Sequence, residues 1–181
     1  ERRAVLVFLY LFLVIAAYLL IKTIRNALFI AEYGAMKLPY VMLGVAVLAA
    51  AVAAVYIRLA RRVPTPRLVF LSLLFFAANI LVFWWLALAG RPWLYPILYI
   101  WTGVFGVIAP TQVWTLANEL FTTRQAKRLF GFIGAGGILG GFVGGAVANR
   151  LATVIGTPQL LLAVVTLLVF AAAWRYTPLA D

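Results

Sequence analysis

The sequence predicts an all-α, polytopic membrane protein with six transmembrane helices. Hydrophobic residues make up 67% of its 181 residues and charged residues only 10%, against about 25% in an average soluble domain. The apolar residues come in long runs that end at charges, prolines or glycines. Since one span needs about 20 apolar residues, the chain has room for six. A soluble enzyme, a disordered tail and a one-pass receptor are excluded.

The first three predicted spans begin after basic residues or beside prolines. The first follows Arg3 and is apolar to Ile21, after which polar residues recur at helical spacing. Pro39 stands at the start of the second span and Pro66 just before the third, where a missing backbone N–H costs little. These three spans cover residues 4–32, 38–60 and 67–89.

The last three predicted spans follow the same logic. Pro96 stands at the start of the fourth, the fifth is rich in glycine, and Pro158 precedes the sixth. They cover residues 95–121, 129–153 and 159–175. We therefore expect residues 1–181 to form a single six-helix bundle, the size of half a transporter, with the C-terminal half absent.

The net charge of +11 would suggest nucleic-acid binding in a soluble chain, but most of the basic residues stand near span ends. Short loops rich in Lys and Arg stay on the cytoplasmic side. This rule predicts cytoplasmic termini and no nucleic-acid partner. One side carries Arg2, Arg3, Arg58, Arg61, Arg62, Arg67, Arg124, Lys127, Arg128 and Arg175, and the other carries Lys37, Arg91 and Arg150.

The polar residues are too few for most catalytic chemistry. The chain has no His, no Cys, one Ser at Ser72, and four carboxylates. A catalytic triad, a Cys nucleophile and a His/Cys metal cage all lack their parts. We therefore expect neither an enzyme nor a bound metal or cofactor.

Charged residues inside the first span are the first candidate site. Lys22 and Arg25 share one helical stripe with Asn26, and Glu32 lies at its edge. An embedded charge costs about 2.5–3.5 kcal/mol on insertion scales, so such residues usually face a water-filled path or a partner. Two interpretations stay open: a long helix lining a cavity, or two side chains that snorkel to the outer headgroups.

A second polar stripe ends the fourth span. Thr115 and Asn118 lie on one line, with Glu119 next to it. Glu119 has three possible roles: a counter-ion for an embedded cation, a substrate-facing acid, or a structural partner of the basic loop that follows. Stripes in the late thirds of the first and fourth spans are also what a three-plus-three inverted repeat produces.

Glycines crowd the fifth span. Their spacing does not match a dinucleotide-binding fingerprint, and no strand precedes them. It does match small-xxx-small packing, which lets helix backbones approach closely. We assign helix packing to two rows, Gly136, Gly140, Gly144 and Gly137, Gly141, Gly145.

Three blocks of sequence carry a family resemblance. They are LIKTIRNALF at 20–29, KLPY at 37–40 and WTLANELFTTRQAKRLFGFIG at 114–134. With them the chain resembles the N-terminal six-helix half of a major facilitator superfamily transporter, and more narrowly the ATP/ADP translocase (nucleotide exchange transporter) family. In that family embedded basic residues of the first helix are implicated in holding nucleotide phosphates, which implies this role for Lys22 and Arg25.

The leading hypothesis is a secondary transporter that moves an organic anion, most plausibly ATP or ADP, by alternating access. Asn26, Thr115, Asn118 and Glu119 would line the cavity with the two cations. Arg124, Lys127 and Arg128 would form an inner gate or funnel. Its partners would be the lipid bilayer and the C-terminal half of the transporter, in a bacterial inner membrane. The alternatives are a major facilitator carrier for another solute, with Lys22 paired to Glu119, and a non-transporting scaffold.

Overall fold

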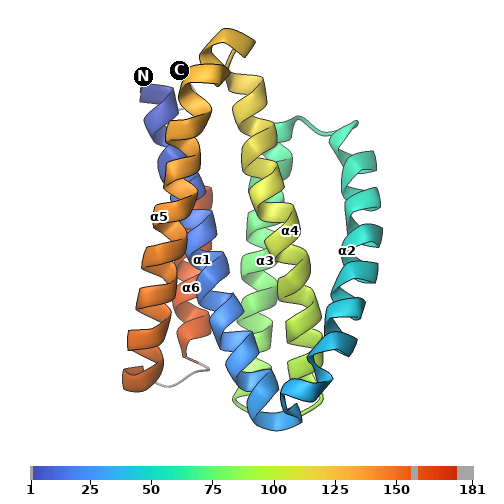
Figure 1. The fold of residues 1–181 in the computed structure, drawn as a ribbon. Helices are drawn as coiled ribbons and strands as arrows, with labels where there is room; N and C mark the ends of the chain where they lie inside the picture. The colour runs from blue at the N-terminus through green and yellow to red at the C-terminus, as the bar shows by residue number, and fades with distance from the viewer. Residues whose placement is uncertain (1, 156–158, 175–181) are drawn as a thin grey trace.

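A computed structural model describes residues 2–155 and 159–174, and every element in this part of the chain is helical (Figure 1). Successive helices run up and down the bundle, joined by short turns. The all-α prediction is confirmed. The elements are α1 (Arg2–Tyr33), the 3₁₀ turn η1 (Ala35–Lys37), α2 (Leu38–Ala60), α3 (Thr65–Ala87), α4 (Leu94–Leu120), α5 (Thr123–Ile155) and α6 (Leu160–Trp174).

Five of the described helices, α1 to α5, are long and apolar enough to cross a bilayer. α6 has 15 residues, or roughly 22 Å at 1.5 Å per residue, against about 30 Å of hydrocarbon core. A sixth crossing therefore stays a prediction. The predicted end of the sixth span, Arg175, lies outside the described residues, as do Pro158 and the chain ends.

The start of α5 differs from the prediction, which placed residues 122–128 in a loop. α4 ends at Leu120 and α5 begins at Thr123. Thr122 and Gln125 form one half of a capping box: Gln125 Oε1 accepts hydrogen bonds from the Thr122 backbone N–H at 3.1 Å and from its hydroxyl at 3.2 Å. As a result, Arg124, Lys127 and Arg128 lie on the first turns of α5.

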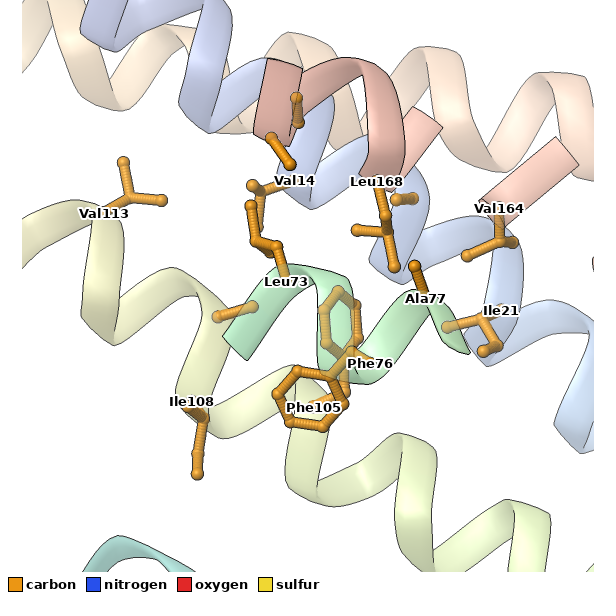
Figure 2. Close-up of a cluster of buried hydrophobic side chains, with 14 of the residues drawn as sticks. Val14, Ile21, Leu73, Phe76, Ala77, Phe105, Ile108, Val113, Val164 and Leu168 are labelled. Carbon is orange, nitrogen blue, oxygen red and sulfur yellow. The ribbon is translucent and has the colours of Figure 1, made fainter. Parts of the chain in front are cut away.

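α1 is the central helix, because it packs against α4, α5 and α6. α3 completes the core between α4 and α6. Figure 2 shows apolar side chains of four helices meeting there. Those labelled are Val14 and Ile21 of α1, Leu73, Phe76 and Ala77 of α3, Phe105, Ile108 and Val113 of α4, and Val164 and Leu168 of α6.

The first glycine row brings α5 against the backbone of α1. A Cβ added at Gly136 or Gly144 would lie 2.6 Å from a carbonyl oxygen of α1, and one at Gly140 would also overlap the α1 backbone. Only glycine allows this approach. The pairs are Gly136 with Phe8, Gly140 with Phe12, and Gly144 with Ala16.

The second row is less close. A Cβ at Gly137 or Gly141 would make ordinary contact with side chains of α1. At Gly145 it would meet no described atom within 4 Å. Gly145, which is half-buried, makes no such close approach among the described residues, so the packing predicted for it stays a prediction.

α2 stands apart from the rest of the bundle (Figure 1) and packs mainly on α4. Ala49 is its one buried residue. Most of its side chains are therefore left for lipid or for another protein surface.

Candidate functional site

The embedded cation Arg25 is held between α1 and α4. Its side chain is 7% exposed. Nη1 donates to the carbonyl oxygen of Tyr99 at 3.0 Å and to the hydroxyl oxygen of Thr102 at 3.2 Å. The guanidinium carbon lies 4.3 Å from the centre of the Tyr99 ring, within the range of a cation–π contact. Arg25 therefore does not snorkel to the headgroups.

α4 is shaped to receive this side chain. A Cβ at Gly103 would lie 3.2 Å from Arg25 Nη1 and 2.5 Å from Val45 of α2. At Gly106, one turn further on, a Cβ would overlap the ring of Tyr18. The two glycines let α4 approach the polar face of α1, and they were not recognised from the sequence as site residues.

Polar groups of the protein surround the charge of Arg25, but no described carboxylate neutralises it. Its partners are a carbonyl, a hydroxyl and an aromatic face, and in the described residues no carboxylate contacts it. Its Nε is buried without a hydrogen-bond partner. Because an embedded charge is costly without a counter-charge, the site retains a net attraction for an anion.

Lys22 and Asn26 flank Arg25 on the same helix. Lys22 is exposed, and among the described residues its ammonium has no hydrogen-bond or ion-pair partner. Asn26 is half-buried, and its Oδ1 is buried without a partner. The structure thus brings together a fixed cation, a free cation and an unpaired amide oxygen.

The polar residues at the end of α4 lie elsewhere. The Thr115 hydroxyl donates to the Thr111 carbonyl of its own helix at 2.9 Å. Asn118 and Glu119 are exposed. Glu119 accepts a hydrogen bond from the hydroxyl of Thr65, in the first turn of α3, where the helix dipole favours a negative charge.

The cations of α1 and Glu119 are far apart, because Arg25 contacts Tyr99 and Glu119 comes about 20 residues after Tyr99 along α4, which is roughly 30 Å of helix. The alternative that Glu119 is a counter-ion of Arg25 or Lys22 is therefore wrong in this structure. So is the alternative that it pairs with the basic residues of α5, since the bond it makes is to Thr65.

Arg124, Lys127 and Arg128 are exposed on the first turns of α5. They lie at the same end of the bundle as Glu119, because α4 ends where α5 begins (Figure 1). The helix order brings Arg58, Arg61, Arg62 and Arg67 to this end as well. The basic groups separated in the sequence thus share one end.

Some polar residues were missed by sequence reasoning. Tyr99 and Thr102 contact Arg25, yet α4 shows little amphipathic pattern there because it is buried on several sides. Gln112, by contrast, is recognisable from the sequence as a neighbour of the polar stripe in the fourth span; it is buried, and its Oε1 accepts a hydrogen bond from the Ser72 hydroxyl at 2.8 Å. The signal that could have found Tyr99 and Thr102 is a polar group in an otherwise apolar span. Among the described residues, no cluster of acidic residues could hold a metal ion.

A bundle of five long apolar helices, with the buried cation Arg25 held between α1 and α4, defines a polytopic integral membrane protein. The family model described as "TLC ATP/ADP transporter" matches residues 77–172, just over half of the chain. The chain belongs to this family of nucleotide transporters, and the ATP/ADP translocase family predicted from the sequence is confirmed. The match runs from α3 into α6. No curated protein and no solved structure matches the chain.

Proposed function

We propose that this chain forms part of a secondary transporter that exchanges ATP and ADP by alternating access, and that Lys22 and Arg25 attract the nucleotide phosphates. The observation that carries the proposal is the embedded pair of cations without a carboxylate in contact. A multiply charged anion supplies the charge that the described residues do not.

The two cations have different parts in this proposal. Lys22 is exposed and unpaired, so it contacts phosphate directly. Arg25 is fixed against α4 behind it and adds a charge that does not move with side-chain rotation. Asn26 lies beside them at this end of the path, and its Oδ1, which has no partner, can accept a hydrogen bond from an N–H or O–H group of the nucleotide but not from ionised phosphate.

The opposite end of the bundle forms the entrance. Arg124, Lys127 and Arg128 are exposed there and raise the local concentration of anions. Thr115 and Asn118 line the path between this funnel and the cations. The hydrogen bond between Thr65 and Glu119 joins α3 to α4 at the same end of the bundle. In the proposed gate this bond breaks when the two helices move apart.

The architecture proposed for the whole transporter has two six-helix halves. In this architecture α6 is the sixth membrane crossing. The helices α1–α3 and α4–α6 form a three-plus-three inverted repeat, as in major facilitator proteins. A C-terminal half covers the open faces of α2 and α5. Many of their large apolar side chains are exposed, as expected of such an interface. Examples are Leu43 and Val47 of α2 and Ile138 and Phe142 of α5. We place it in a bacterial inner membrane with both termini cytoplasmic.

Nucleotide exchange in liposomes tests the proposal. In the complete transporter, Lys22→Gln should lower uptake of labelled ATP against internal ADP at least about 10-fold, because a charge-assisted hydrogen bond to phosphate contributes about 1.5–3 kcal/mol. Lys37→Gln is the matched control, since Lys37 is an exposed lysine in the turn beyond α1. Uptake by Lys22→Gln equal to that of the control would exclude the phosphate role. Uptake of another anion without competition by ATP or ADP would exclude the nucleotide.

A further inference from the structure

An apolar groove of about 460 Å³ lies between α2 and α3, with α4 at its floor. It is unrelated to the cations of α1. Its polar side-chain groups are the hydroxyls of Tyr56 and Ser72 and the indole N–H of Trp101. The remaining wall is aliphatic and aromatic, and includes Val55, Phe75 and Trp101. Such a surface is suited to hydrocarbon.

The groove exists because α2 packs on α4 and hardly touches α3, its neighbour in sequence. On the α3 side, Phe75 and Trp101 meet edge to face, with ring centroids 5.7 Å apart. Both Val55 and Phe75 are more than half exposed. In a bilayer this opening is filled by lipid chains or by another protein.

Three arginines are sequence neighbours of the residues that line the groove where α2 turns into α3. Leu59, Val63 and Leu68 line that end, and Arg58, Arg62 and Arg67 are their exposed sequence neighbours. Arg61 lines a second groove nearby, between α2 and α4. Among the residues that the structure describes, the carboxylate at this end of the bundle is Glu119, which is bonded to Thr65, so the arginines dominate the charge of this described part.

We propose that this groove binds an anionic phospholipid. Its acyl chain lies along Val55, Phe75 and Trp101, and its headgroup phosphate lies between Arg62 and Arg67. Charge complementarity decides between the occupants: a transmembrane helix would fill the apolar wall equally well, but it would leave the arginines without a partner. Basic pockets between helices at a membrane surface suit phosphate headgroups.

Lipid retention by the purified full chain tests this inference. Native mass spectrometry in detergent compares phosphatidylglycerol with phosphatidylcholine of the same acyl chains. Phosphatidylglycerol should be retained more tightly. Arg62→Gln with Arg67→Gln should weaken its retention on the order of 10- to 30-fold, whereas Lys37→Gln with Arg91→Gln, which removes two charges at the other end of the bundle, should not.

A second pair of variants tests the groove itself. Val55→Trp fills it and should lower the retention of both lipids, whereas Val47→Trp, on an equally exposed part of α2, should leave retention unchanged. Melting temperatures show that each variant is folded. Equal retention of the two lipids would overturn the headgroup contact. Wild-type retention by Val55→Trp would overturn the groove, and a dimer broken by Val55→Trp would show that a second copy fills it instead.

Discussion

Arg25 shows how this chain keeps a charge inside an apolar bundle. The guanidinium has five N–H donors in a planar fork, and α4 presents a carbonyl, a hydroxyl and a ring to it. None of these groups removes the positive charge. The cost of embedding the charge is reduced by dipoles, and the remaining field is available to an anion entering from the exposed side, where Lys22 stands.

The hydroxyl of Thr102 gives a prediction at this scale. Thr102→Val removes one acceptor from Arg25 and should lower the free energy of unfolding by about 1–2 kcal/mol. Thr111→Val is the control, because the Thr111 hydroxyl is exposed and bonds only to its own helix. Thermal unfolding of the purified chain measures both. Equal melting temperatures for the two variants would show that Thr102 does not stabilise the arginine.

At the scale of the helices, α1 and α5 form the closest pair. Their contact uses glycines four residues apart on α5 and backbone carbonyls at the same spacing on α1. Beside this line the rings of Phe8 in α1 and Phe132 in α5 stack, with centroids 4.7 Å apart.

Substitutions at two glycines of α5 distinguish the effect of packing on stability from the effect of helix propensity. Gly140→Ala places a Cβ against the backbone of Phe12 and should lower the free energy of unfolding by about 1–3 kcal/mol. Gly145→Ala meets open space and should raise it by up to about 1 kcal/mol, because alanine favours the helix. Melting temperatures of the two variants should therefore shift in opposite directions. A rise in both would mean that α5 does not touch α1 there.

At the scale of the whole molecule, the order of the helices determines at which end of the bundle each basic residue lies. Basic residues from the α2–α3 turn and from the start of α5 lie at one end, and Lys37 and Arg91 lie at the other. The positive-inside rule assigns the first end to the cytoplasm. In this predicted orientation the proposed funnel would face the cytoplasm, and Arg25 would lie in the outer half of the membrane.

The absence of cysteine makes this orientation directly testable. In intact cells Arg91→Cys should react with a membrane-impermeant maleimide, and Arg62→Cys should react only after permeabilisation. Both side chains are exposed at the ends of the bundle, so access to them depends on the membrane alone. The reverse labelling pattern would invert the proposed topology.

The sequence by itself determined the all-α class, the approximate helix ends and the family, and it singled out Lys22 and Arg25 as candidates. These follow from local properties: the length of apolar runs, the position of prolines and the identity of residues in contiguous blocks. It also gave the spacing of Gly136, Gly140 and Gly144, because a helical repeat is visible in one dimension.

Only the tertiary structure decided which residues meet. In the structure Arg25 contacts Tyr99 and Thr102, whereas Glu119 contacts Thr65. Arg25 and Glu119 lie far from each other, because the level of a residue along the bundle depends on how the antiparallel helices dock. The groove beside α2 also depends on helix docking, because α2 packs on α4 and hardly touches its sequence neighbour α3. Contacts between distant segments depend on shape and packing, which a pattern along one chain does not encode.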